Sequence, residues 1–554
     1  MNILFGKYRC FLSVFALLSF CTTLTVAQVD DISTEILKPF KAQLAECNKR
    51  FASPLLPPLD TNTSRLEYNV PEHVVTVKYP APNLRPIAMS GEEPTPASVF
   101  YVKAGFGYPI SPNLELSYHN KKNKNLKFSS NFKHLSSQGN QANQVFGNTH
   151  FDLNGTYFLK NGLAVGAKLG VNIDEYRFFG YHQLPDTLGL FPDSIEVPKD
   201  SVLQNFTEVF GNIHCFNGTI NSMQLNYKAD IDFHYLTDKY KATEFVFAPR
   251  IEVEKWLGSS KNKHRIFAGL NLNSATFSKD SSNSRLLVGF NPGIDLNFGI
   301  FKARAAVNLG SSEQKFFVFP DIKLNLEIAE GKFGIYAGWS GQIKTNTFRG
   351  LSRYNPFISS SLNLRHTRHS EIFGGLTGSL KNVGFDLRAA YTFADNLPFF
   401  MNDSAQNYLR FNVLYNNFRI LNFRGSLDFS LIKNLTIGAT ASYNLYMGEN
   451  DAIAYQLPVL ETNFTVKYQL KQLLLKSEIY FNAGVPYKEI LSNENKMLNG
   501  LFDINFSASY WIGKKKQNFG LFAEINNILN NKNERWYLYP QIGFNARAGI
   551  LLKF

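Results

Sequence analysis

Apolar and polar residues alternate along most of the chain, from about residue 98 to the end, in segments of roughly ten residues. In the segment 163–174, for example, the odd positions are Leu, Val, Ala, Leu, Val and Ile, and the even positions are mostly glycine or polar. Successive side chains of a β-strand point to opposite faces, so this segment predicts a strand with one apolar and one polar face. The same alternation recurs in residues 421–431, 435–445, 502–512 and 544–554.

Two structures produce such an alternation: a soluble β-sandwich with a wet outer face, or a membrane barrel with an oily one. The apolar faces here end in aromatic residues such as Tyr443, Tyr510 and Phe554, as membrane-interface girdles do. No clean repeat of about 20–50 residues is present, which disfavours a propeller. The pattern therefore favours an all-β fold, a transmembrane antiparallel β-barrel, over residues 98–554.

The connections between the predicted strands are of two kinds, as in outer-membrane barrels with short turns on one rim and long loops on the other. The tight turns are 160–162, 381–383 and 432–434. The long polar and aromatic connections are 175–203, 343–360, 394–404, 487–499 and 530–541.

The number of strands follows less directly from the pattern. About 23 segments qualify, whereas bacterial barrels usually have an even number of strands. The up-and-down order also fails around 394–420, where 406–415 and 418–431 are predicted as two strands and the short turn between them falls on the long-loop side. We therefore predict about 22 strands, with a range of 18–24.

The last segment, 544–554, has the pattern of a closing strand. Its even positions are apolar and would face lipid, which keeps Arg547 and Lys553 inside; an Arg or Lys facing lipid near the midplane would cost on the order of 2–4 kcal/mol. A closing strand pairs with the first strand and leaves no open edge. The other candidate lumen-facing polar residues are Lys168, Asp174, Arg424, Asp428, Asp503 and Asn505. They either fill the lumen with a polar network or tune which solutes pass.

The first 97 residues differ from the rest of the chain. Residues 1–27 read as a signal peptide: Lys7 and Arg9 precede a short apolar stretch, and Thr25-Val26-Ala27 offers small residues for cleavage. Cys21 is a candidate for the lipidated cysteine of a lipoprotein, but the bulky Phe20 directly before it disfavours this interpretation. Residues 28–97 form a second segment, a short polar helix or unstructured lead over 28–52 followed by a proline-rich stretch over 53–96. Proline lacks an amide donor, so the stretch is predicted to be extended, with short edge strands at 67–70 and 74–79.

Composition and charge narrow the class of protein further. The formal charge is +13, but Lys and Arg are scattered, so no nucleic-acid module is predicted. The chain has four cysteines, and after signal cleavage Cys47 and Cys215 would remain, as a pair or as two lone thiols. Beyond the N-terminus, no run of about 20 apolar residues predicts a transmembrane helix.

No catalytic or metal-binding pattern stands out. His366 and His369 are three positions apart, so on a strand they point to opposite faces and cannot share a metal. Nucleophile-elbow, HExxH, Walker and CxxC motifs are absent from the sequence. We therefore predict neither an enzyme nor a bound metal or cofactor.

The end of the chain, "GLFAEINNILNNKNERWYLYPQIGFNARAGILLKF", resembles the C-terminal end of TonB-dependent outer-membrane receptors. The matching residues are Asn527, Leu529, Asn530, Trp536, Tyr539, Pro540, Gly543 and Phe554. The general style of the sequence resembles that of proteins from Bacteroidetes-type bacteria. The resemblance implies a receptor-like barrel in the outer membrane, closed by a motif of Trp536, Tyr539, Pro540, Gly543 and Phe554. An aromatic last residue also resembles the signal read by the barrel-assembly machinery. The segment before residue 98 is too short for the plug domain of such receptors, so energised uptake is not implied.

Two functions remain open. The first is passage or uptake of solutes across the outer membrane, with residues 53–96 acting as a hatch in the lumen or as a strap below it. The second is a structural or assembly subunit that docks a periplasmic or envelope partner through residues 28–97, since extended proline-rich peptides suit protein grooves. Outer-membrane lipid is an expected partner in both.

Overall fold

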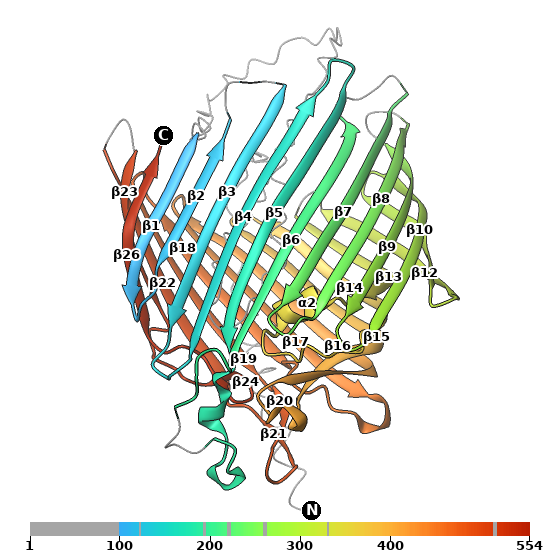
Figure 1. Ribbon diagram of the computed structural model, residues 1–554. Coiled ribbons are helices and arrows are strands. Elements are labelled where there is room, and N and C mark those ends of the chain that lie inside the picture. Colours follow the sequence, from blue (N-terminus) through green and yellow to red (C-terminus); the bar gives the residue numbers. More distant parts are fainter. Residues whose placement is uncertain are drawn as a thin grey trace, which may run out of the picture. The chain divides into compact units, whose positions relative to one another are not determined.

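Twenty-two strands form one closed antiparallel β-barrel in the computed structural model (Figure 1). The structure describes residues 99–120, 123, 125–191, 196–218, 223–258, 263–329, 332–513 and 518–554. The predictions for residues 1–27 and 28–97, including the edge strands, the hatch and Cys47, lie outside the described residues. The predicted all-β barrel of about 22 strands is confirmed.

The barrel strands pair with their neighbours in chain order, and β26 returns to β1. They are β1 (Phe100–Tyr108), β2 (Asn113–His119), β3 (Leu126–Gln138), β4 (Val145–Phe158), β5 (Leu163–Arg177), β6 (Leu203–Asn217), β7 (Leu225–Asp238), β8 (Thr243–Leu257), β9 (His264–Ser278), β10 (Ser282–Phe298), β11 (Phe301–Ser312), β12 (Lys315–Ala329), β13 (Phe333–Thr345), β14 (His366–Leu380), β15 (Val383–Asn402), β16 (Phe411–Ile432), β17 (Leu435–Gly448), β18 (Leu460–Gln469), β19 (Leu473–Ala483), β22 (Leu501–Ile512), β23 (Phe519–Asn526) and β26 (Asn545–Lys553).

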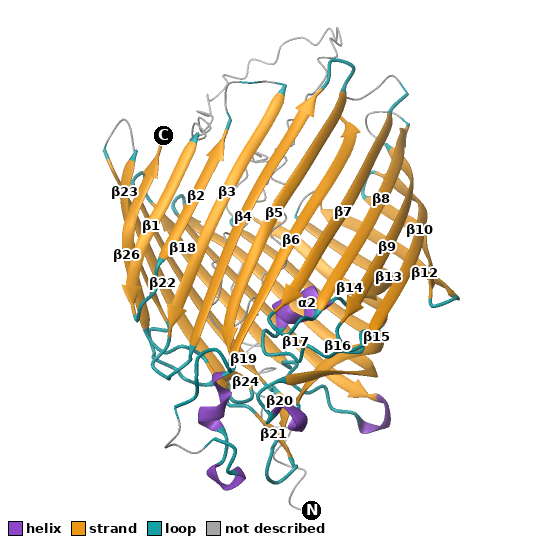
Figure 2. Cartoon of the chain, viewed as in Figure 1, coloured by secondary structure: helices purple, strands orange, loops and turns teal. Residues whose placement is uncertain are grey.

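The remaining described elements lie in connections between barrel strands (Figure 2). They are the 3-10 turns η1 (Phe179–Gln183), η2 (Asp186–Leu188), η3 (Ser404–Gln406) and η4 (Glu449–Asp451), the helix α2 (Phe348–Tyr354), and the short strands β20 (Pro486–Lys488), β21 (Asn495–Met497), β24 (Glu534–Trp536) and β25 (Tyr539–Pro540). Among the described residues, no helix is long and apolar enough to cross a bilayer.

The predicted closure of the barrel is confirmed. Strand β26 pairs with β1 from Tyr101 opposite Lys553 to Tyr108 opposite Ala546. The backbone N–H of Phe554 donates to the carbonyl of Phe100 at 2.9 Å, so pairing continues to the last residue. No free sheet edge is left at this seam, which removes a site for pairing with other chains.

The odd strand count has a single cause. Residues 406–415 and 418–431 were predicted as two strands, but β16 runs unbroken through both, and β15 runs on to Asn402. The predicted loop 394–404 is therefore mostly strand, and the true connection is 403–410. The pairing register shifts between Ala394 and Leu397, and the backbone N–H of Asn396 donates to the side chain of Asn417 at 3.1 Å. The predicted short turn is therefore part of a β-bulge, which bends a strand without ending it.

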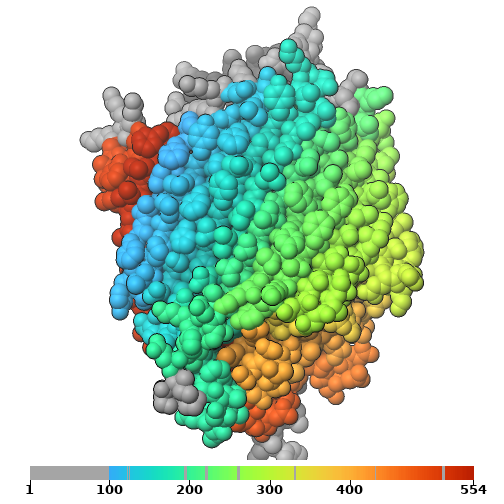
Figure 3. All heavy atoms as spheres, viewed as in Figure 1, coloured from blue at the N-terminus to red at the C-terminus, as the bar shows by residue number. Residues whose placement is uncertain are grey.

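The outer face of the barrel is apolar, as the alternation predicts. Val165, Leu169 and Ile173 of β5 are exposed, and on β26 Ile550 is exposed in the same way. Figure 3 shows the outer surface over the strands that follow β1 in the sequence. Large exposed apolar residues on strand after strand are what a lipid-facing barrel wall requires.

The two rims differ as predicted. Because consecutive strands are antiparallel, the turns 159–162, 381–382 and 433–434 lie on one rim, together with Phe100 and Phe554. The long connections lie on the opposite rim, where Figure 2 shows the helical turns gathered. They are 178–202, 346–365, 403–410, 449–459, 484–500 and 527–544.

Candidate functional site

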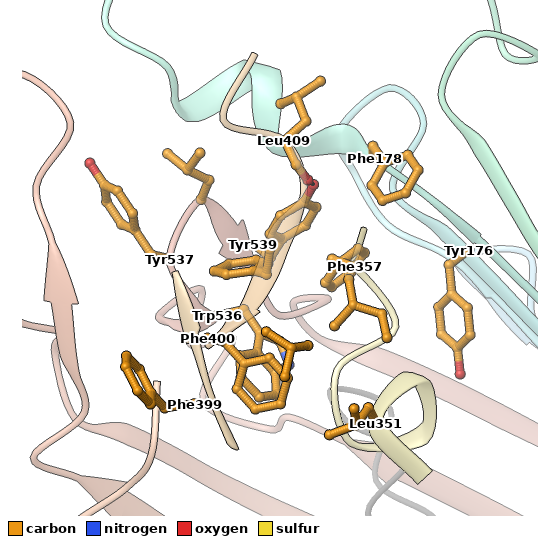
Figure 4. Packing of buried hydrophobic residues seen from close by; sticks show 14 of the residues in the cluster. Tyr176, Phe178, Leu351, Phe357, Phe399, Phe400, Leu409, Trp536, Tyr537 and Tyr539 are labelled. Atoms are coloured by element: carbon orange, nitrogen blue, oxygen red, sulfur yellow. Dashed lines mark hydrogen bonds between the residues drawn. The ribbon is translucent and has the colours of Figure 1, made fainter. Parts of the chain in front are cut away.

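The long connections pack against one another in a hydrophobic cluster, here called the loop core (Figure 4). Its main members are Phe178, Phe179, Leu351, Phe357, Ile358, Phe400, Leu409, Trp536, Leu538 and Tyr539. They come from the end of β15, which carries Phe400, and from connections that are far apart in the strand order, between β5 and β6, β13 and β14, β15 and β16, and β23 and β26. Loops that start from distant parts of the rim can meet only over the mouth of the barrel. The loop core therefore extends across this mouth.

The connection 527–544 lies at the centre of the loop core. Trp536 is 0% exposed, and its ring contacts those of Tyr354 and Phe400 with centroids 5.2 and 5.5 Å apart. The hydroxyl of Tyr539 donates to the carbonyl of Leu409, and the side-chain amide of Gln144 donates to the carbonyl of Pro540 at 3.0 Å. This one connection thus contacts three others, 346–365 through aromatic rings and 403–410 and 139–144 through hydrogen bonds.

Asparagine side chains hold the base of this connection. The amide of Asn527 donates to the carbonyls of Asn531 and Ile542 at 2.6 and 2.9 Å, so it joins the two ends of the loop. The backbone N–H of Phe544 donates to Asn530 Oδ1 at 2.9 Å. A Cβ on Gly543 would lie 2.3 Å from that same oxygen, so only glycine permits this approach.

A second connection, residues 346–365, is here called the inserted loop because its helix α2 docks on inward-facing residues of the barrel wall. Thr347 caps α2 by accepting a hydrogen bond from the N–H of Gly350 at 3.0 Å. On its return, the N–H of Ser359 donates to the carbonyl of Phe411 at 2.8 Å, and the Ser360 hydroxyl donates to Asp238. The loop is therefore fixed to the wall and to the start of β16.

Two buried carboxylates of the wall hold α2. Glu208 of β6 is 2% exposed and lies 2.5 Å from Arg349 Nε and 2.7 Å from Arg353 Nη2. Glu244 of β8 is 0% exposed and accepts hydrogen bonds from the N–H groups of Phe348 and Arg349 at 2.7 and 2.9 Å. Burial lowers the pKa of Arg349 to about 10, with the like charge of Arg353 as the next cause. We call this arrangement the latch.

The sequence analysis missed the latch. Glu208 and Glu244 occupy polar positions of their strands, where a glutamate looks the same whether it faces water or an arginine. Arg349 and Arg353 are four residues apart, a spacing that puts both on one face of a helix. That spacing is the one sequence signal that could have pointed to a shared partner.

The wall beside the latch is lined with hydrogen-bonded polar side chains of β4–β6. His150 Nε2 lies 2.7 Å from Asp152, and Asn172 donates to Glu208 at 2.7 Å. Asp174 accepts from Asn148 at 2.6 Å. Most of these groups form hydrogen bonds with one another, as buried polar groups require.

The structure places the predicted polar residues on several strands rather than in one site. Lys168 and Asp174 lie on the face of β5 opposite Val165 and Leu169, with Lys168 Nζ 4.0 Å from Asp152. Arg424 and Asp428 lie on β16, where they pair with Ser442 and Gly438 of β17.

The remaining predicted residues lie near the closing seam. Asn505 accepts from the N–H of Asn527 at 3.0 Å and donates to Asp503 at 3.5 Å, so β22 supports the base of connection 527–544. Lys553 Nζ lies 4.1 Å from the centroid of the Trp511 ring.

Arg547 belongs to an ion cluster at the seam. Glu524 of β23 lies 2.8 Å from Arg547 Nε of β26 and 2.6 Å from Lys103 Nζ of β1. The cluster therefore joins three successive strands where the barrel closes. Lys103 and Glu524 were not among the predicted residues.

The C-terminal motif is divided between the two ends of the barrel. Trp536 and Tyr539 lie in the loop core, Pro540 follows Tyr539 in β25, and Gly543 lies at the base of the same connection. Phe554 is exposed at the opposite rim. His366 and His369 lie on β14, paired with Thr345 and Gln342 of β13. Within the described ranges, no group of three His, Cys, Asp or Glu residues is placed to hold a metal ion.

A closed barrel with an apolar outer face, a polar inner wall and a mouth covered by packed loops has the architecture of outer-membrane receptor barrels. Comparison with solved structures supports this class. The ferric enterobactin receptor PfeA from Pseudomonas aeruginosa, in complex with BCV-L6, aligns with a TM-score of 0.61 at 10% identity over 82% of this chain and 81% of that chain. The FrpB iron transporter from Neisseria meningitidis aligns with a TM-score of 0.62 at 9% identity over 82% and 81%.

A third receptor gives the same result. The ferripyoverdine receptor of the outer membrane of Pseudomonas aeruginosa, bound to ferripyoverdine, aligns with a TM-score of 0.59 at 9% identity over 84% of this chain and 72% of that chain. At such identities the likeness shows the fold alone. No family model and no curated protein matches the chain. The chain thus shares its barrel fold with these receptors and this transporter, in line with the receptor-like barrel that the C-terminal resemblance implied.

Proposed function

We propose that this protein lies in the outer membrane and takes up a solute through its barrel, with entry controlled by the loop core and the inserted loop. The observation that carries the proposal is the contrast between the apolar loop core and the polar barrel wall beside the latch. Hydrophobic rings from distant connections pack together across it, whereas the wall beside the latch is polar. A barrel of this width needs something in its mouth or lumen to prevent free leakage.

Ferric chelates are the first solutes to test. The similar structures are named as receptors for ferric enterobactin and ferripyoverdine and as an iron transporter. Their fold is shared but their loops are not expected to be, at about 10% identity. The solute class is therefore part of the proposal and is to be measured by uptake of radiolabelled iron chelates into cells that express the chain.

The other roles considered for the chain are weaker. An assembly subunit would act through residues 28–97, which lie outside the described residues, so that role stays a prediction. We propose that the protein is not an enzyme, because the similar structures are named as receptors and transporters.

Planar bilayers give the decisive measurement. The wild-type chain is expected to conduct little, and the combination of Trp536→Ala with deletion of residues 53–96 is expected to open a large conductance. Trp536→Ala removes the largest fully buried side chain of the described residues, and the deletion removes the predicted hatch. Phe316→Ala, at an exposed position, is the matched control. A silent combined variant, or release of the wild type from membranes by carbonate, would contradict the proposal.

A further inference from the structure

Two buried basic side chains at the base of the inserted loop lack the partners that buried polar groups normally have. Arg285 of β10 is 4% exposed, and its Nη1 donates to the carbonyl of Asn346 at 2.6 Å. Its Nε and Nη2 have no hydrogen-bond partner among the described residues. His366, the first residue of β14, is 6% exposed, and both of its ring nitrogens are unpartnered in the same part of the structure.

The backbone brings these two side chains to one place. His366 pairs with Thr345 across β13 and β14, and Thr345 directly precedes the Asn346 that accepts from Arg285. The side-chain amide of Asn346 donates to the carbonyl of Arg365 and to the hydroxyl of Thr367, both at 2.8 Å, so it contacts the residues on either side of His366. The charge of Arg285 acts on His366. The hydroxyl of Thr345 is also buried without a described partner.

The charge of Arg285 is not offset by a direct ion pair. Within the described ranges, no carboxylate oxygen lies within 4.0 Å of its guanidinium nitrogens. Glu244 and Glu313 act on Arg285 only from a distance, and the two oxygens of Glu244 accept from the N–H groups of Phe348 and Arg349. A buried cation without a carboxylate in contact is destabilising, so this arrangement favours binding of a negative charge.

We propose that Arg285, His366 and Thr345 bind one small oxyanion, a phosphate, a sulfate or the carboxylate of an organic acid. The forked guanidinium presents two free N–H groups that match two oxygens of such an anion. The imidazole and the hydroxyl add donors. A buried water could satisfy the hydroxyl and the imidazole, but it would leave the charge of Arg285 uncompensated.

The position of the site gives the anion a second effect. Arg285 belongs to the wall, whereas Asn346 begins the inserted loop and His366 directly follows it. An anion held by Arg285 and His366 therefore ties both ends of the inserted loop to β10. The donor atoms are covered in this conformation, so the anion enters when the base of the loop moves away from β10. This inference does not depend on which solute the barrel transports.

The test uses the full-length chain in detergent, with inorganic phosphate added at constant ionic strength maintained by chloride. Equilibrium dialysis with radiolabelled phosphate is expected to show one saturable site per chain. Hydrogen exchange in residues 346–365 is expected to slow about tenfold at saturation, which corresponds to about 1.4 kcal/mol. Sulfate and acetate, run as separate arms, show whether the site prefers a tetrahedral anion or a carboxylate.

Three variants decide the outcome. Arg285→Met is expected to abolish phosphate binding, and His366→Ala to weaken it about tenfold while the barrel stays intact. Arg250→Met is the control, because Arg250 lies on β8 with an exposed side chain. Absence of saturable binding in the wild type, or equal binding by the Arg250→Met and Arg285→Met variants, would overturn the proposal. Should Arg285→Met fail to fold, unchanged affinity in His366→Ala and Thr345→Val would overturn it as well.

Discussion

The ring of Phe357 stacks on the ring of Tyr539, with centroids 3.6 Å apart and planes inclined by 12°. Phe357 belongs to the inserted loop between β13 and β14, and Tyr539 belongs to the connection between β23 and β26. The contact joins two loops from distant parts of the rim, so it couples the inserted loop to the loop core. The predictions below test this coupling and the features around it.

Phe357→Ala is expected to loosen both loops together. Removing a buried phenylalanine typically costs about 3–5 kcal/mol, and here the cost falls on the closed arrangement of the loops. Limited proteolysis and hydrogen exchange should show faster opening in 346–365 and 527–544, with unchanged exchange in the barrel strands. Phe316→Ala, at an exposed position, should change neither loop. Opening confined to 346–365 alone would show that the two loops are not coupled.

Glu208→Gln is expected to release the latch. The change leaves Arg349 and Arg353 without their buried carboxylate, and breaking a buried pair costs about 3–5 kcal/mol. Exchange in α2 should rise by at least a hundredfold relative to the wild type. Glu252→Gln removes an exposed partner of Arg250 and serves as the control. If both variants behaved alike, the latch would contribute no more than a surface pair.

The loop core is expected to weaken as pH rises through neutrality. Burial raises the pKa of Glu534 from 4.5 to about 7, with a hydrogen bond from the Leu538 backbone as an opposing cause. In the closed loop Glu534 keeps its proton up to about pH 7, whereas in the open loop it loses the proton near pH 4.5. The contribution of Glu534 to the stability of the closed loop is therefore fully present below pH 4.5 and is lost as the pH rises to about 7. After correction for the intrinsic pH dependence of amide exchange, the protection of amides in 527–544 should be lower at pH 8 than at pH 5.

Two variants check that Glu534 causes this pH dependence. Glu534→Gln should remove it, because the amide is neutral throughout the range. Glu489→Gln should leave it in place, since the hydrogen bonds from Ser492 lower the pKa of Glu489 rather than raise it. A pH profile unchanged by Glu534→Gln would assign the effect to another group.

Glu524→Gln is expected to weaken the closing seam. Glu524 offsets the charges of Lys103 and Arg547, so its loss leaves two cations on the neighbouring strands β1 and β26 without this carboxylate. The temperature at which the folded barrel unfolds on a gel should fall by several degrees. Glu327→Gln removes the partner of Lys302 in a more exposed pair, and should have little effect. If the two variants unfolded at the same temperature, the ion cluster at the seam would contribute no more to stability than the exposed pair.

Deletion of residues 53–96 tests the prediction from sequence that this stretch is a hatch. Conductance in planar bilayers should rise when the stretch is removed from a chain that also carries Trp536→Ala. The matched comparison is Trp536→Ala in the full-length chain. Equal conductance of the two would favour a strap below the lumen.

The sequence by itself determined the barrel. Side chains alternate with a period of two on every strand, and lipid on one side forces that period into the amino-acid pattern, as in β5 and β26. The same logic placed the tight turns and the closing strand. It failed around 394–420, where a break in the alternation predicts a short turn, because a β-bulge also interrupts the period of two but does not end the strand.

Only the tertiary structure decided how the mouth is closed. Glu208 meets Arg353 from a position 145 residues away, and Tyr539 reaches Leu409 across 130 residues. Such contacts depend on where each connection leaves the rim, and no local period records them. A glutamate at a polar strand position has one sequence signature whether it faces water or a buried arginine. The physical reason is that the alternation along a strand depends on whether each side chain faces lipid or the lumen. Which residues meet across the mouth depends instead on where the closed barrel places each connection on its rim.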